Sequence, residues 1–156
     1  MKLIRLLVTI FLVCLCSNWA VETGAVPLDA AQEQFFSQFR TSINGENTRQ
    51  LIQLTHPKSS ACTRADDQER YYEMVLKGLV QMLGRQQTIK EIESKKVDAQ
   101  SLKQGTDAAA QSSMRWPITP EEQLVIKYEK EGSESSATLY IAREQDQWKW
   151  VHLCYE

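Results

Sequence analysis

The sequence predicts an α+β fold: about three helices packed on a curved antiparallel sheet of about four strands. Through the first half of the chain, apolar residues recur at the three-to-four-residue spacing of helices. Through the C-terminal third they alternate with polar residues at the two-residue spacing of strands. Helices that precede the strands, rather than alternating with them, are typical of a layered α+β domain.

Residues 1–25 read as a secretory signal peptide: a basic start, the apolar run Leu6–Cys16 and small-residue sites at Ala20 and Ala25. The run of about 11 residues is shorter than the roughly 20 that a membrane-spanning helix needs. Residues 26–156 have the length of one domain. We expect an exported protein, periplasmic or extracellular, with no stable membrane insertion after cleavage. An uncleaved N-terminal anchor is the alternative.

The charge of the mature chain argues against nucleic acid as a partner. Loss of Lys2, Arg5 and Glu22 with the leader reduces 18 basic and 20 acidic side chains to 16 and 19, a net charge of −3. The two signs are interspersed, whereas a nucleic-acid site needs a concentrated basic surface.

Two cysteines, Cys62 and Cys154, remain once the leader is removed. An even pair in an exported protein most simply forms a disulfide. Closing a loop of about 93 residues would stabilise the fold by about 4.5 kcal/mol in the chain-entropy model, less any strain. The alternative is a Cys62 nucleophile with His152 or His56 as its base.

The first helix is predicted to begin after Asp29 and to end at Asn44–Gly45. Asp29 can accept hydrogen bonds from first-turn N–H groups, and Gln32 completes a capping box. Gly45 can take the left-handed conformation that ends many helices. The apolar positions at helical spacing are Leu28, Phe35, Phe39 and Ile43.

A short second helix is predicted over Thr48–Leu54, capped by Asn47. His56 is expected to cap carbonyls at its end, and Pro57–Thr63 to form a polar connector. The third helix is predicted from about Arg64 to Leu83 and is closed by Gly84. Its apolar stripe comprises Tyr72, Val75, Leu76, Leu79, Met82 and Leu83.

The second half of the chain reads as strands and loops. A partly exposed strand is expected over residues 87–98, then a polar loop over 99–113 with a helical turn near 106–111. Two prolines make residues 114–120 extended. Strands are predicted over 123–130, 137–143 and 148–155, joined by turns at 132–136 and 145–147.

The last predicted strand separates its side chains into two sets. Trp148, Trp150, His152 and Cys154 share one face, and Lys149, Val151, Leu153 and Tyr155 share the other. Bridged Cα atoms lie only about 4.4–6.8 Å apart, so a Cys62–Cys154 disulfide would turn the first face toward the helices. Val151 and Leu153 would then pack the other side or a partner.

The order of elements, the step Leu51–Pro57 and the final aromatic hairpin resemble the cone-shaped roll of nuclear transport factor 2-like proteins, a superfamily that includes ketosteroid isomerase and scytalone dehydratase. The resemblance covers Asp29 to Tyr155. It implies a curved sheet with helices over its concave face and a pocket between them.

We expect a non-catalytic binding or accessory protein with an apolar aromatic pocket, since such walls with a few polar groups are typical of small-molecule sites. Its candidate contacts are Trp148, Trp150, His152 and Tyr72. The partner would be a small apolar ligand or a protein. One alternative is a pocket enzyme of the isomerase or dehydratase type, which only the fold analogy supports. The other is a homodimer or docking module, whose mark would be exposed Val151, Leu153 and Tyr155.

No catalytic, cofactor or metal motif is legible. The chain lacks a glycine-rich phosphate loop, a G-x-S-x-G sequence and a haem motif. Its two histidines, even with Asp66 or Asp67, lack the spacing of metal ligands. We therefore expect neither a cofactor nor a metal.

Overall fold

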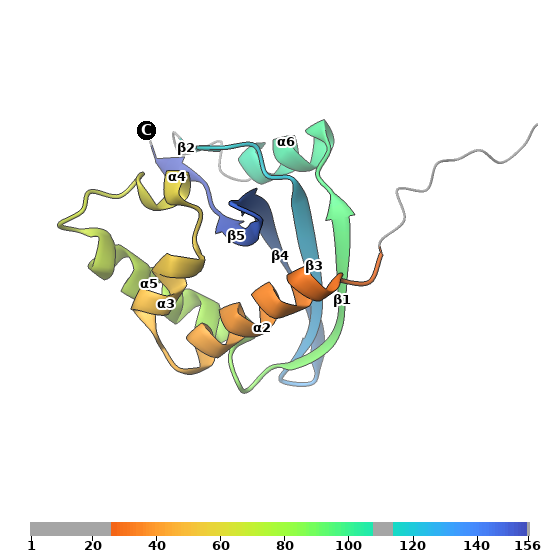
Figure 1. Ribbon diagram of the computed structural model, residues 1–156. Coiled ribbons are helices and arrows are strands. Elements are labelled where there is room, and N and C mark those ends of the chain that lie inside the picture. Colours follow the sequence, from red (N-terminus) through yellow and green to blue (C-terminus); the bar gives the residue numbers. More distant parts are fainter. Residues whose placement is uncertain (1–25, 108–113, 156) are drawn as a thin grey trace, which may run out of the picture.

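The computed structural model describes residues 26–107 and 114–155 and confirms the α+β class (Figure 1). The helices are α2 (Ala30–Asn44), α3 (Thr48–Leu54), α4 (Pro57–Ser60), α5 (Gln68–Leu83) and α6 (Ala99–Asp107). The strands are β1 (Thr88–Lys96), β2 (Met114–Arg115), β3 (Glu122–Lys130), β4 (Ser133–Glu144), β5 (Gln147–Val151) and β6 (Cys154–Tyr155). The predicted signal peptide lies outside the described residues, and no helix among those described is long and apolar enough to span a membrane.

Two sheets form. The larger is antiparallel in the order β1-β3-β4-β5, and β2 pairs with β6 in a separate two-stranded sheet. Strand β1 has an irregular register between Ile89 and Glu91 where it pairs with β3. The turns on either side of β4 contain left-handed residues: Glu131 and Gly132 before it, Gln145 and Asp146 after it. Such turns match the twist of antiparallel strands.

Helices α2 and α3 begin where the sequence predicts. The side chain of Asp29 accepts a hydrogen bond from the Gln32 N–H at 2.8 Å, and the Gln32 side chain accepts one from the Asp29 N–H at 3.0 Å. The side chain of Asn47 caps α3 by accepting the Gln50 N–H at 3.0 Å. The left-handed residue after α2 is Glu46, with φ of 48°, and not the expected Gly45, whose φ is −92°.

Helix α5 is shorter than predicted at its start. Arg64 forms ion pairs with Asp66 and Asp67, in turns that precede the helix. In the predicted stripe, Tyr72, Leu76, Leu79 and Leu83 are buried and Val75 is half-buried, but Met82 was wrongly included because it is 41% exposed. Gly84 ends the helix as expected: a Cβ there would lie 2.3 Å from the Val80 carbonyl oxygen, which leaves room only for glycine.

Two predicted loops contain helices instead. Within the expected connector, Pro57 starts α4, and Nδ1 of His56 accepts the Lys58 N–H at 3.2 Å. Within the expected loop at 99–113, Asp98 accepts the Ser101 N–H at 2.7 Å and starts α6. His56 and Asp98 each cap the start of a helix. The polar composition of both segments led to the prediction of loops instead. Residues 108–111 of the predicted helical turn lie outside the described residues.

The predicted continuous strand at 148–155 is wrong. Strand β5 ends at Val151, and the chain resumes as β6 in the other sheet. The break occurs because Ser59 of α4 takes the place of a neighbouring strand. Its hydroxyl accepts the His152 N–H at 3.2 Å and lies 3.3 Å from the His152 carbonyl oxygen.

The main core lies between α2, α3 and α5 and the inner face of the large sheet. Trp150 meets Phe39 edge-on, with ring centroids 5.5 Å apart. Val151, whose exposure would have been one mark of the docking-module alternative, is buried, with only 1% accessible. It lies on the outer face beside Tyr140, which contacts Trp116 at 4.7 Å and donates a hydrogen bond to the Ser101 carbonyl of α6. Tyr155, another mark of that alternative, is exposed.

The α3–α4 connection closes the β5 edge of the sheet. Thr55 pairs with Trp150 in a parallel bridge, and the His56 N–H donates to the Trp150 carbonyl at 2.7 Å. A few residues on, Cys62 and Cys154 form the predicted disulfide, with Cα atoms 5.6 Å apart. The disulfide therefore fastens β6 to the same segment that covers the edge of β5.

Cys62→Ser should lower the free energy of unfolding by about 4 kcal/mol under oxidising conditions, because the loop it closes is long. Cys62 is exposed, so the substitution leaves the core intact. Urea unfolding with and without a reductant checks this. The parent in reductant should match the variant, and equal midpoints of the two proteins without reductant would contradict the stabilising role.

Candidate functional site

His152 lies at the centre of a buried hydrogen-bonded chain. Its Nδ1 lies 2.9 Å from the Leu153 carbonyl oxygen, and its Nε2 lies 2.8 Å from the Tyr72 hydroxyl. A carbonyl can only accept, so Nδ1 carries the ring proton and Nε2 accepts from Tyr72. This geometry selects the neutral imidazole, with both ring nitrogens engaged.

Burial favours the neutral forms of both side chains. It lowers the pKa of His152 below its usual 6.5, a shift that the hydrogen bond to Leu153 only partly opposes. It raises the pKa of Tyr72 far above its usual value. Both side chains are therefore neutral at neutral pH, as expected of a structural contact.

His56 is held in a similar way. Its Nδ1 accepts the Lys58 N–H, so Nε2 carries the proton and lies 3.3 Å from a carboxylate oxygen of Glu144. Burial lowers its pKa, and the Glu144 charge opposes that effect. The side chain is only 2% exposed. The basic lone pair of each neutral ring is already used, by the Lys58 N–H in His56 and by the Tyr72 hydroxyl in His152, although Nε2 of His56 forms no hydrogen bond. The disulfide occupies the thiol that the Cys62-nucleophile alternative requires.

The structure places three of the predicted pocket residues inside the core. Tyr72, Trp148 and Trp150 are 0%, 5% and 8% exposed. Trp150 and His152 lie together, with ring centroids 5.0 Å apart, as do Tyr72 and His152 at 5.7 Å. Trp148 lies farther along β5, under the guanidinium of Arg143.

A hollow of about 220 Å³ reaches His152 from the surface. It lies at the disulfide corner, lined by Cys62, Arg64, Tyr71, Leu153, Cys154 and Tyr155 among others. It touches neither Tyr72 nor the tryptophans. Of the four predicted contacts, only His152 is reached from this hollow.

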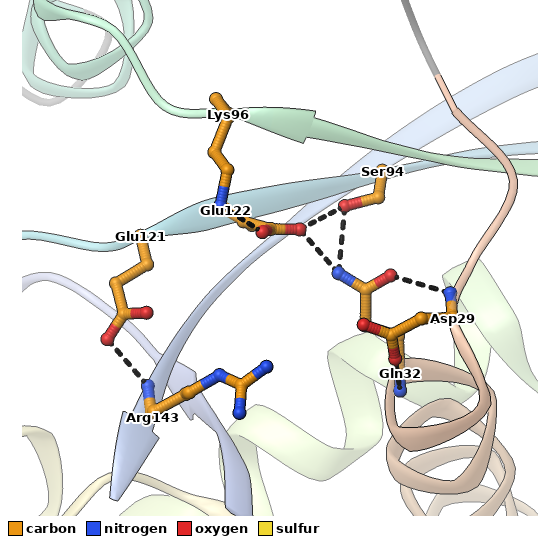
Figure 2. Close-up of polar contacts among 7 residues, drawn as sticks. All are labelled: Asp29, Gln32, Ser94, Lys96, Glu121, Glu122 and Arg143. Atoms are coloured by element: carbon orange, nitrogen blue, oxygen red, sulfur yellow. Dashed lines mark hydrogen bonds and ion pairs between the residues drawn. The ribbon is translucent and has the colours of Figure 1, made fainter. Parts of the chain in front are cut away.

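A polar network lies where α2 meets the sheet (Figure 2). The Gln32 amide donates to Ser94 at 3.0 Å and to the carboxylate of Glu122, which also accepts from Ser94 and from Lys96. Gln32 and Ser94 are 3% and 1% exposed. The same glutamine completes the α2 cap, so one side chain joins the start of α2 to β1 and β3.

Glu122 is held as a carboxylate by this network. Burial alone would raise its pKa, but hydrogen bonds from Lys96, Ser94 and Gln32 outweigh burial and lower it. Every polar contact of the network is internal, which indicates a structural role. The capping-box pattern identified Gln32, but nothing in the sequence linked it to Glu122, 90 residues away.

A larger hollow, of about 620 Å³, lies between α2 and the edge of β1; we call it the α2–β1 groove. The groove runs along α2. Near one end the Gln32 amide donates a hydrogen bond to Ser94, and near the other end Arg40 donates one to the Gln87 carbonyl at 3.0 Å. Its wall is mainly apolar, with charged side chains at the rim. The lining residues are Pro27, Leu28, Glu33, Phe36, Ser37, Arg40, Thr41, Asn44, Ile89, Lys90, Glu91 and Ile92.

Unpaired polar atoms gather at one end of this groove. In the part of the chain that the structure describes, six buried side-chain atoms lack a hydrogen-bond partner. Three of them, Arg40 Nε, Asn44 Oδ1 and Gln87 Oε1, lie here, and the others are the ring nitrogens His56 Nε2, Trp116 Nε1 and Trp148 Nε1. Gln87 is 6% exposed. Asn44 and Gln87 also line an adjoining hollow of about 440 Å³. Buried polar groups are normally satisfied, so such a cluster is expected where a ligand or ordered water binds.

Comparisons with family models, with curated proteins and with solved structures found no match. Among residues 26–107 and 114–155, no group of three or more acidic, histidine or cysteine side chains is placed to hold a metal ion. The candidate site therefore rests on geometry. No sequence pattern indicated the groove, because its walls come from a helix and a strand that local patterns do not place side by side.

The ring of His152 should titrate below pH 6.5 in the folded protein. Because the unfolded state then binds protons more readily, the free energy of unfolding should decrease as the pH falls from 6.5 through the folded pKa. NMR titration, with His152→Gln to assign the resonance, measures this. A midpoint at or above 6.5 would show that the ring is not held neutral.

Glu122→Gln should destabilise the fold at pH 7 by about 1–3 kcal/mol, the usual cost of losing hydrogen bonds to a buried charge. The pKa of Glu122 is lower in the folded state than its usual value of 4.5. The charged carboxylate therefore stabilises the fold fully above pH 4.5, and this stabilisation is lost as the pH falls through the folded pKa. Urea midpoints from pH 7 to 3 should therefore converge for parent and variant. Glu121→Gln, at the exposed neighbouring carboxylate, is the control, and a gap that stays constant with pH would contradict the role of this charge.

Proposed function

We propose that the protein is an exported, non-catalytic binding module and that the α2–β1 groove is its binding site. The observation that carries the proposal is the combination of a long, mainly apolar groove with buried polar atoms that lack partners at one end. Apolar walls with a few convergent polar groups are the usual composition of binding sites.

The side chains that could perform catalysis support binding instead. His152 uses both ring nitrogens in hydrogen bonds, and His56 uses Nδ1 to accept the Lys58 N–H, while its Nε2 lies 3.3 Å from Glu144 without forming a hydrogen bond. Cys62 and Cys154 are joined to each other. An isomerase or dehydratase would need a pocket acid or base, and neither histidine lines the α2–β1 groove.

Export is supported by two independent features. The first 25 residues have the three-part pattern of a signal peptide. The mature chain has a disulfide, which persists mainly in oxidising compartments. Together they favour a periplasmic or extracellular location.

Membership of the nuclear transport factor 2-like superfamily is part of the proposal. It is supported by helices that cover one face of a four-stranded antiparallel sheet. The predicted aromatic pocket corresponds best to the hollow beside His152, which is the second candidate site. Its volume is about a third of that of the α2–β1 groove.

Ser37→Trp should block the α2–β1 groove, because Ser37 is an exposed residue of α2 that lines it. Gln38→Trp is the matched control: it is equally exposed on the same helix but does not line the groove. A library of small apolar fragments, screened by NMR against the oxidised protein, should shift groove amides in the parent and in Gln38→Trp only. Shifts gathered around His152 instead would move the site to the disulfide corner.

A further inference from the structure

The geometry points to an extended peptide segment of a partner protein as the occupant of the α2–β1 groove. The segment would add to β1 as an antiparallel strand and place its C-terminal carboxylate at Arg40. This inference rests on the proposed function and names the class of ligand. Strand addition at a sheet edge is a general mode of peptide recognition.

The first argument is the free edge of β1, which lies at one side of the sheet in Figure 1. On the side of β1 that faces away from β3, the N–H and the carbonyl of Ser94 both form backbone hydrogen bonds with Val26. In an antiparallel ladder these directions alternate, so the N–H and carbonyl of Ile92 also point outward. Within the described residues, nothing pairs with this side of β1 between Thr88 and Glu93.

The second argument is that the edge and the groove coincide. Ile89 and Ile92 pair with Tyr128 and Ile126, two core residues, so their side chains face the helical side of the sheet. Both line the groove. A strand added to this edge would therefore direct every second side chain into the apolar space beneath Phe36 of α2, while its backbone bonds Ile92.

The third argument is charge. An antiparallel segment would run toward the start of β1, so its C-terminal end would arrive beside Gln87 and Arg40. Arg40 has no carboxylate partner in the described part of the chain, and its Nε donates to nothing there. An arriving carboxylate would pair with this guanidinium. The unpaired oxygens of Asn44 and Gln87 would accept N–H groups of the same segment.

Pairing at the other end of β1 limits the length of the segment. Val26 already occupies the edge at Ser94. A segment can therefore add only along Thr88–Glu93, where the bulge next to Ile89 interrupts regular pairing. This edge accommodates a short segment, with one or two apolar side chains directed into the groove.

The experiment uses random heptapeptides displayed with free C-termini and selected on the exported, oxidised protein. Selected peptides are synthesised as free acids and as amides. We expect the free acid to slow hydrogen exchange at the Ile92 amide and to bind about tenfold more tightly than the amide, the effect of one charge-assisted contact. Arg40→Gln should remove that difference, while Arg49→Gln, an exposed arginine outside the groove, should preserve it.

Three results would overturn the inference. One is a selection that yields no groove-binding peptide. Another is peptides that bind there without protecting Ile92 or without dependence on Arg40. The third is a concentration-dependent dimer, seen by sedimentation, whose formation protects Ile92 and excludes peptide, which would assign the edge to a second copy of the chain. If fragments still occupy the groove in each case and Ser37→Trp still excludes them, the proposed binding site survives the failure of strand addition.

Discussion

The bridge between Thr55 and Trp150 is the contact on which the rest of the structure depends. Beside it, the His56 N–H donates to the carbonyl of Trp150, whose side chain meets Phe39 in the core. The bridge therefore fixes the helical layer against the last strand of the sheet. Beyond the end of β5, the hydrogen bond from His152 to Ser59 and the Cys62–Cys154 disulfide join the same two parts of the chain.

This arrangement makes the two edges of the sheet unequal. The β5 edge is closed by the α3–α4 connection, which protects it from adding another strand. Among residues 26–107 and 114–155, the β1 edge is paired only at Ser94, by Val26. Helix α2 is anchored at both ends, through Gln32 and through Arg40, and lies along the open edge. The groove and the unpaired strand edge thus arise from the same asymmetry.

The sequence predicted features that depend on neighbouring residues or on the number of cysteines. The Asp29–Gln32 cap, the limits of α3 and the pairing of Cys62 with Cys154 all follow from such rules. It did not predict the break of the last strand at His152, because the cause is Ser59, 93 residues away. The burial of Val151 likewise depends on α6 and Trp116, which cover the outer face. The groove has no local signature, and the aromatic residues that suggested a pocket are mostly core.

Amide hydrogen exchange along β1 tests the central claim, that one sheet edge is closed and the other open. In the free protein, Glu91 and Glu93 bond β3 and should exchange slowly, while Ile92 between them should exchange fast. The His56 amide, bonded to Trp150, should be among the slow ones. Slow exchange at Ile92 in the free monomer would show that this edge is already covered and would contradict the account.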